Sequence, residues 1–367
     1  MSLDVTLQTD PDVILDDPVA EARRQVEVCN ACRYCEGFCA VFPAITREKV
    51  FADGDITQLA NLCHNCRGCY YACQYTEPHD WALNLPRALA DARADSWERL
   101  AWPGGIARLF QTSGTAIAAA LVVGFALMFA AIAALPGGGE GFYAYLGHNA
   151  MIAIFIPAFL FPLVSLTISI RRYWSEVGGG RVTWSALRDA ALSAGRLKNL
   201  NGGQGQGCNF EKEDRFSDGR RHVHHAIMYG FLLCFASTTS GTILHYVFDA
   251  KAPYGFWSLP KLLGVPGGLL LVAGCIGMVM LKRKADPNLG APGRESGSAA
   301  FIWLLGFVGL SGLLLYAVRG TGLTGPMLAL HLGGVLTFFL LTPFSKMAHG
   351  FYRLTALVKD AGDKAAR

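Results

Sequence analysis

From Gly114 onward the chain alternates between long apolar stretches and short polar segments. Six stretches carry no charged residue, and each is about 20 residues long, enough to cross the hydrocarbon core of a bilayer as a helix. They are Thr115–Leu135, Ala150–Ile170, Val223–Phe248, Leu262–Leu281, Ala299–Val318 and Pro326–Ser345. This pattern predicts an all-α membrane domain of six transmembrane helices at residues 114–349.

Composition agrees with a membrane protein. Hydrophobic residues make up 52% of the chain and charged residues 16%, and the mean hydropathy is positive, which is unusual for a soluble domain. The net charge is +4, and the distribution of basic residues explains it without any nucleic-acid partner.

Lysine and arginine are distributed unevenly between the connecting segments. The segments after the first, third and fifth stretches hold only Lys251, Lys261 and Arg319. The other segments hold Arg171, Arg172, Arg181, Arg188, Arg196, Lys198, Lys212, Arg215, Arg220, Arg221, Lys282, Arg283, Lys284, Arg294, Lys346, Arg353, Lys359, Lys364 and Arg367. Because basic loops stay in the cytoplasm, we predict a multi-pass protein of the bacterial inner membrane with both termini cytoplasmic.

Polar segments flank the predicted spans. In residues 81–113, tryptophans stand among charged side chains, which favours an interfacial linker helix lying against the lipid headgroups. The alternative is an ordinary linker helix packed beside the N-terminal cysteines. We further predict a cytoplasmic loop at residues 171–221 and a cytoplasmic tail at residues 350–367.

Eight of the eleven cysteines form two copies of the pattern C-x2-C-x2-C-x3-C, with a constant offset of 34 residues between the copies. In two-cluster ferredoxins, each such motif gives three thiolates to one [4Fe–4S] cluster and its fourth to the other. The first predicted ligand set is therefore Cys29, Cys32, Cys35 and Cys73. The second is Cys63, Cys66, Cys69 and Cys39.

Two other uses of these cysteines are disfavoured. Zinc sites use four ligands per metal and do not require this run twice at identical spacing. Disulfides persist in oxidising compartments, whereas Met1–Arg24 lacks the apolar segment of a signal peptide. Ala40 and Gln74 stand where bacterial ferredoxins have proline, and residues 56–75 have a helical pattern. We therefore predict a helical two-cluster ferredoxin module at residues 1–80.

Histidines near the ends of the third and sixth stretches are candidate axial ligands of haem. His224 and His225 begin the third stretch, and His245 lies near its end. His331 and His349 hold the matching positions around the sixth stretch. The histidines therefore fall at two depths in the membrane. His245 and His331 lie at the outer depth, and His224 or His225 lies with His349 at the inner depth. They predict b-type haem, with two haems as the expected number.

Helical spacing distinguishes His224 from His225 as the candidate ligand at the inner end of the third stretch. His331 and His349 are 18 residues apart, which is five turns, so they share one face. His224 and His245 are 21 apart, six turns at 3.5 residues per turn, and this favours His224 over His225. The alternative for any one of them is an interfacial histidine that hydrogen-bonds headgroups or backbone. His64, His79, His148 and His222 are assigned no ligand role.

The chain shows no flavin- or nicotinamide-binding pattern. The run from Gly202 to Gly207 lacks G-x-G-x-x-G spacing and a preceding strand. Electrons are therefore expected to come from a separate protein. No nucleophile or acid–base pair is evident, so we expect an electron-transfer subunit rather than a complete enzyme.

Several motifs together resemble the tricarballylate- or citrate-utilisation protein B family. They are VCNACRYCEGFC at residues 28–39, LCHNCRGC at 62–69, RRHVHH at 220–225 and YGFLLC at 229–234. The resemblance extends from Cys29 into the C-terminal region. It implies a membrane protein with two [4Fe–4S] clusters and b-type haem. The membrane domain is also similar to the gamma subunit of respiratory nitrate reductase.

The resemblance also implies a role. Members of this family reoxidise a separate FAD-dependent dehydrogenase, of the tricarballylate-utilisation protein A type, which converts tricarballylate to cis-aconitate. We expect electrons to reach a membrane quinone. The alternatives are a redox subunit of an oxygen-using flavoprotein monooxygenase system, as in cobalamin-ring biosynthesis, and a structural membrane anchor with zinc fingers.

Overall fold

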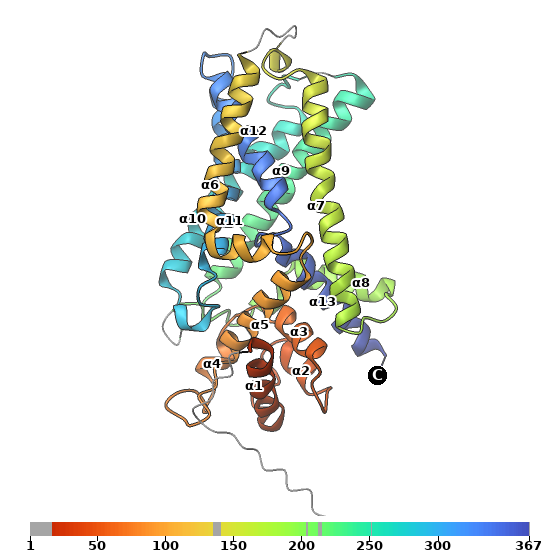
Figure 1. The fold of residues 1–367 in the computed structure, drawn as a ribbon, viewed down its shortest axis with the longest axis vertical. Coiled ribbons are helices and arrows are strands. Elements are labelled where there is room, and N and C mark those ends of the chain that lie inside the picture. Colours follow the sequence, from red (N-terminus) through yellow and green to blue (C-terminus); the bar gives the residue numbers. More distant parts are fainter. Residues whose placement is uncertain (1–16, 135–140, 203–204, 212–214, 251, 367) are drawn as a thin grey trace, which may run out of the picture.

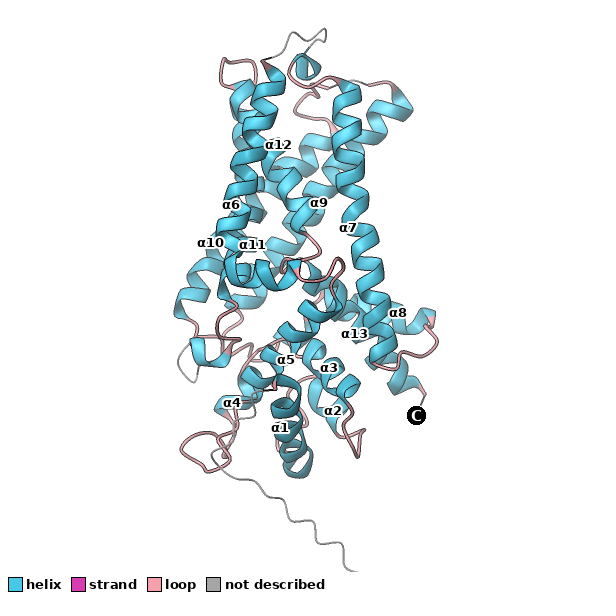
Figure 2. Cartoon of the chain, viewed as in Figure 1, coloured by secondary structure: helices cyan, strands magenta, loops and turns pink. Residues whose placement is uncertain are grey.

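The computed structural model describes residues 17–134, 141–202, 205–211, 215–250 and 252–366. In these residues the chain forms thirteen α-helices and three short 3-10 helices (Figure 1), and no β-strand is present among them (Figure 2). The all-α prediction is confirmed. The following residues entered the predictions but lie outside the described part: residues 1–16, Leu135, Gly203, Gln204, Lys212, Lys251 and Arg367.

Five helices build the N-terminal module. They are α1 (Pro18–Cys32), α2 (Val41–Ile45), α3 (Asp53–Leu62), α4 (Gly68–Tyr71) and α5 (Leu85–Leu100). Asp17 caps α1 by accepting hydrogen bonds from the Val19 and Ala20 amides, and Asn84 caps α5 by accepting one from the Arg87 amide. The predicted helical segment 56–75 contains most of α3 and all of α4, with a short cysteine-bearing loop between them.

Helix α5 packs inside this module. Leu85, Leu89 and Ala92 are buried in one apolar core with Val26 of α1 and Leu59 of α3. Such burial stabilises a helix by about 25 cal/mol per Å² of apolar surface. Of the two interpretations left open for residues 81–113, this packing corresponds to the linker helix beside the cysteine motifs.

Among the residues that the structure describes, six helices are long and apolar enough to cross a membrane. They are α6 (Ile106–Ala133), α7 (His148–Glu176), α9 (Gly219–Phe248), α10 (Leu259–Lys284), α11 (Glu295–Ala317) and α12 (Thr324–Leu341). Each contains most of one predicted stretch, and several begin or end a few residues outside it because polar residues continue the helix beyond the apolar core.

Small residues allow α9 and α10 to lie close together. A Cβ atom at Gly230 of α9 would come within 2.6 Å of the Leu271 backbone nitrogen, and one at Gly274 of α10 within 2.8 Å of the Ile227 nitrogen. Larger side chains there would push the two backbones apart, as at other small-residue interfaces between membrane helices.

Two further α-helices lie outside the long six, α8 (Trp184–Gly195) and α13 (Ala348–Ala365). The 3-10 helices are η1 (Gly141–Ala144), η2 (Lys198–Leu200) and η3 (Pro287–Leu289). Residues 350–367, predicted as a tail, form most of α13, and this helix packs against α3, α7 and α8. Gln58 of α3 donates a 2.9 Å hydrogen bond to the Ala356 carbonyl of α13, and Tyr352 stacks on Trp97 of α5.

The long axis of the molecule separates its two ends. The N-terminal module, α8 and α13 gather at one end of the six long helices (Figure 1). The described parts of the segments that join α6 to α7, α9 to α10 and α11 to α12 lie at the other end (Figure 1). The arginine-rich segment 171–221 is therefore at the same end as the cysteine motifs.

Candidate functional site

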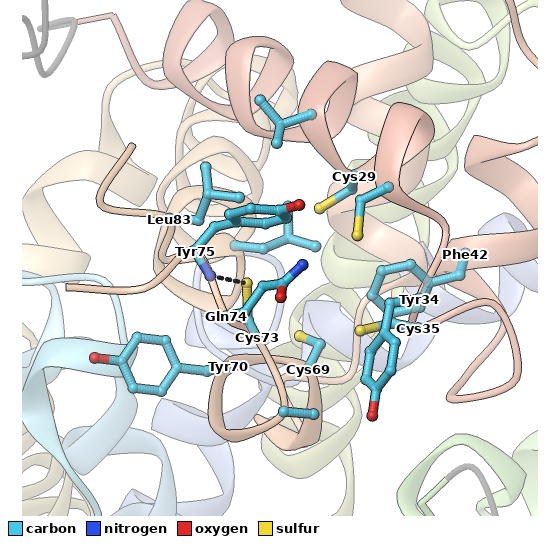
Figure 3. A pocket seen from close by; sticks show the side chains of 14 residues that line it. Cys29, Tyr34, Cys35, Phe42, Cys69, Tyr70, Cys73, Gln74, Tyr75 and Leu83 are labelled. Carbon is cyan, nitrogen blue, oxygen red and sulfur yellow. Dashed lines mark hydrogen bonds between the residues drawn. The ribbon is translucent and has the colours of Figure 1, made fainter. Parts of the chain in front are cut away.

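The first cysteine set lines an open cavity beside α1. Cys29 and Cys32 lie about one turn apart in α1, and Arg33, left-handed at φ 57°, ends that helix and turns the chain toward Cys35. Cys73 reaches the same cavity from the end of α4. Figure 3 shows the sulfur atoms of Cys29, Cys35, Cys69 and Cys73 around one common space. The cavity of about 250 Å³ is far larger than the ~30 Å³ share of one water molecule.

The second cysteine set lines an adjoining, smaller cavity of about 20 Å³. Cys63 follows α3, Cys69 belongs to α4, and Cys66 lies in the loop between these helices. Asn65 and Arg67 flank Cys66 in left-handed conformations, with φ of 52° and 67°, and so give this loop its tight course. The fourth cysteine, Cys39, comes from the other repeat, just before α2.

Each cavity therefore combines cysteines of both repeats. Cys73 joins the first set and Cys39 joins the second, as in the ligand exchange of two-cluster ferredoxins. Cys69, Phe42 and Leu85 line both cavities, so the two are direct neighbours. Five cysteines line the first cavity and four line the second, with Cys69 common to both, and this set of thiols fits iron–sulfur ligation.

The side chains are arranged differently from the ligands of a single ion. In the described residues, no three histidine, cysteine, aspartate or glutamate side chains converge as ligands of one metal ion do. Zinc requires such convergence, with Zn–S bonds of about 2.3 Å. The ligands of a four-iron cluster each bind a different iron and stand further apart.

Burial makes these thiols poor acids without bound metal. It raises the pKa of Cys29 and of Cys35 to about 12, and neighbouring cysteines add to the rise. It also raises the pKa of Cys66 to about 11. The thiolates that bind iron must therefore be stabilised by the positive charge of the metal, and binding releases protons.

A pair of histidines lies between the module and the long helices. The rings of His224 in α9 and His349 in α13 are 5.9 Å apart between centroids. Two imidazoles on opposite sides of one metal ion, with bonds of about 2 Å, have centroids roughly 6 Å apart. The His349 Nδ1–H donates to the Lys346 carbonyl, which leaves Nε2 with its lone pair. His224 Nδ1 is buried and has no hydrogen-bond partner.

His225 lies apart from this pair. Its Nε2 donates a 3.2 Å hydrogen bond to the Gly195 carbonyl at the end of α8, and the Tyr229 hydroxyl donates to the same oxygen at 2.9 Å. Of the two adjacent candidates, the structure brings His224 to His349 and directs His225 toward α8.

The opposite end of the bundle has a second histidine pair. His245 of α9 lies with its ring 5.3 Å from that of His148, the first residue of α7, and Tyr143 and Tyr246 lie beside them. His331 of α12 contacts α11 instead, where its Nδ1 is 3.0 Å from the Ser311 hydroxyl. In the described residues, the ring neighbours of His245 are thus His148 and the two tyrosines, and the predicted His331 is not among them.

Phenylalanine rings occupy the region between the two levels. Helix α9 packs closely against α10, whereas it meets α7 and α12 through aromatic side chains. The Phe159 and Phe235 rings are 6.4 Å apart, and those of Phe231 and Phe338 are 5.7 Å apart. Helices that approach through large side chains leave more space between their backbones than α9 and α10 do.

Comparison with known proteins identifies the family. The family model of citrate utilization protein B matches residues 114–367, and that of the citrate utilization protein B Fer4-like domain matches residues 22–98. The chain belongs to the citrate utilization protein B family. It is 40% identical to citrate utilization protein B of Escherichia coli over 357 residues, which cover 96% of this chain and 94% of that protein. No solved structure matched.

Family membership confirms the predicted resemblance and the iron–sulfur character of the N-terminal module. Sequence analysis assigned no ligand role to His148, and the structure places its ring beside that of His245. A signal was present, since His148 lies at the same outer level as His245. Depth alone pairs His245 with His331, whereas the structure places the His331 ring beside Ser311 of α11. Spacing along one helix does not show which neighbouring helix a side chain contacts.

Proposed function

We propose that this protein is a membrane electron-transfer subunit that reoxidises an FAD-dependent dehydrogenase of the tricarballylate-utilisation protein A type and delivers the electrons to quinone. The observation that carries the proposal is the arrangement of eight cysteines around two adjoining cavities at one end of a six-helix bundle. The setting we propose is the bacterial inner membrane, with the module and α13 on the cytoplasmic side, where the basic segments lie.

The residues of the module hold and insulate the redox groups. Cys29, Cys32, Cys35 and Cys73 would bind one [4Fe–4S] cluster, and Cys39, Cys63, Cys66 and Cys69 the other. When bound, these clusters supply one-electron carriers. The exposed first cavity, bordered by Tyr34 (71% exposed), gives a soluble partner direct access to the module.

The membrane domain is proposed to hold b-type haem. His224 and His349 suit one haem, because one ring nitrogen is buried without a partner and the other ring is oriented by a backbone carbonyl. A second haem belongs at the His245 level, where His331 was predicted as its partner and His148 lies beside it.

The test is the cofactor content and activity of the purified protein in detergent. We expect about eight iron and eight acid-labile sulfide per chain beyond haem iron, and reduction of a quinone analogue only when the flavoprotein and its substrate are present. A colourless protein with two zinc ions contradicts the proposal. Cofactors of the expected number without quinone reduction would place the acceptor elsewhere and contradict the quinone step.

A further inference from the structure

Three arginines from three separate helices converge on the loop that carries the second cysteine set. Arg93 of α5 donates to the carbonyls of Ala60 at 3.0 Å and Cys63 at 2.9 Å. Arg353 of α13 donates to the same Cys63 carbonyl at 2.9 Å. Arg220 of α9 donates to the carbonyls of Asn65 at 2.6 Å and His64 at 3.0 Å. We call Arg93, Arg220 and Arg353 the arginine trio.

The trio holds positive charge that neighbouring carboxylates do not neutralise. Among the residues that the structure describes, no aspartate or glutamate forms an ion pair with any of the three. Arg93 is only 9% exposed, and Arg353 Nε is buried without a hydrogen-bond partner. Buried cations are normally paired, because leaving water is costly. We therefore expect an anion to bind near these three arginines.

The nearest candidate for this anion is the metal centre that the second cysteine set would hold. Four thiolates bring more negative charge than the iron–sulfur core neutralises, so the ligated centre is anionic. The trio binds the backbone of this set at Cys63 and at the two following residues. These hydrogen bonds place the three guanidinium groups at the loop that carries the thiols, and attraction between opposite charges is stronger in a partly buried site than in water.

The first cysteine set has different surroundings. Its cavity is bordered by Tyr34, Tyr70, Gln74, Tyr75 and apolar residues, and no lysine or arginine is among the described side chains that line it, whereas Arg67 lines the second cavity. Cys32 is exposed to solvent. The two centres thus share one fold and one ligand type but differ in fixed positive charge and in exposure, the two properties that set cluster potentials alongside hydrogen bonding.

The trio also connects the second set to the histidine pair. Arg220 precedes His224 by four residues in α9, and His349 precedes Arg353 by four residues in α13. Residues four apart lie on the same face of a helix, one turn from each other. Each histidine of the pair therefore has, one turn away, an arginine that binds the loop of the second set.

We propose that Arg93, Arg220 and Arg353 act as positioning residues that raise the reduction potential of the centre in the second cysteine set above that of the first. Positive charge favours the reduced state, which carries one more electron. The exposed first set then faces the electron donor, and the second set faces the membrane. The inference rests on the proposed function and adds to it the order of the two centres.

The test is a redox titration of the purified holoprotein followed by electron paramagnetic resonance. We expect Arg353→Gln and Arg93→Gln to lower the potential of one centre only. Cys32→Ser assigns the signals, since it alters the first centre, and the centre moved by the arginine variants must be the other one. Arg353→Lys keeps the positive charge, so the reduction potential of the second centre should stay close to its wild-type value.

Matched controls keep the result interpretable. Arg87→Gln removes a half-exposed arginine from the same helix as Arg93 and should leave both potentials unchanged. If Arg353→Gln does not accumulate, Arg220→Gln provides the same measurement from another helix. Equal shifts of both centres, a shift of the first alone or no shift overturns the inference. Wild-type protein without clusters would overturn the proposed function as well, whereas normal cluster content with unmoved potentials overturns the inference alone.

Discussion

Cys39 and Cys73 occupy the fourth position of their motifs, yet each side chain lines the cavity of the opposite repeat. The exchange follows from chain geometry. Cys39 stands just before α2, beside Cys63 at the end of α3, while Cys73 follows α4 and returns toward α1. Each centre therefore depends on one side chain from the other half of the module.

This exchange gives the first prediction. Cys39→Ser should remove or alter the centre of the second set, and Cys73→Ser that of the first, each with a loss of up to about half of the cluster iron. Iron and sulfide analysis with paramagnetic resonance measures the loss. Cys208→Ser, which changes a buried cysteine outside both sets, is the control and should keep the full iron content. If Cys39→Ser alters the signal of the first centre alone, the assignment is wrong.

A second prediction compares two adjacent histidines. His224→Ala should lose about half of the haem, because its ring faces His349. His225→Ala should keep it, because this side chain bonds the Gly195 carbonyl. Haem absorbance per chain measures the loss. If His225→Ala loses haem and His224→Ala keeps it, His225 is the ligand. Because a haem held by two histidines would have no open coordination position, carbon monoxide should leave the wild-type spectrum unchanged.

A third prediction concerns the far end of the bundle. His148→Ala and His245→Ala should each remove about half of the haem, because the two rings lie 5.3 Å apart. His331→Ala should retain it, because the His331 ring is not among the ring neighbours of His245 in the described residues. Loss of haem in His331→Ala with full retention in His148→Ala would instead support the pairing expected from depth alone.

These residues show what a sequence reveals and what it does not. The cysteine sets were predictable, because spacing within a short segment restricts which thiols can meet. The six spans were predictable from apolar length. The contacts of His148 and Arg353 were not predicted, because they depend on how α7 meets α9 and how α13 meets the cysteine loop. Contacts between distant segments leave no periodic signal in one sequence.

At the scale of elements, α5 and α8 show that similar patterns have different outcomes. Both contain tryptophan among charged and apolar residues. Trp97 of α5 is partly buried, donates a 2.8 Å hydrogen bond to Asn61 and stacks on Tyr352. Trp184 of α8 is 81% exposed, with Leu187 and Leu192 also exposed on the same short helix. Helix α8 therefore retains the properties of an interfacial helix, and α5 does not.

Helix α13 supplies the fourth prediction. Tyr352 is fully buried between Trp97 and Tyr173, so Tyr352→Ala should destabilise the docking of α13 by about 3 kcal/mol, as aromatic-to-alanine changes in cores do. Thermal unfolding and proteolysis of the module measure the change. Phe351→Ala removes the adjacent, 39% exposed ring and should have a much smaller effect. Equal effects of the two substitutions would show that α13 is not held by this contact.

At the scale of the whole molecule, the basic segments, α13 and the cysteine module share one end of the bundle (Figure 1). Arg47 of the module and Asp360 of α13 form an ion pair across this end, and Arg99 of α5 pairs with Glu176 of α7. The two halves of the chain are therefore joined by polar contacts as well as by the aromatic packing around Tyr352.

This polarity gives the fifth prediction. Alkaline phosphatase fused after Gly320, between α11 and α12, should be active, because that segment lies at the end poor in lysine and arginine. A fusion after Asp286, between α10 and α11, should be inactive. A cytoplasmic fluorescent reporter at the same positions is the control and should give the reverse. Activity at Asp286 alone would mean that the protein is inserted in the opposite orientation.

The docking of α13 has a consequence for biogenesis. The ribosome releases the cysteine module before any of the six spans, but Gln58 and Tyr173 find their partners in α13 only after all six have been made. The module therefore remains incompletely packed while the spans enter the bilayer one after another. A chain that stops after α12 would leave the face of α3 that packs against α13 exposed. Proteases and chaperones that act on incompletely folded membrane proteins could then bind it.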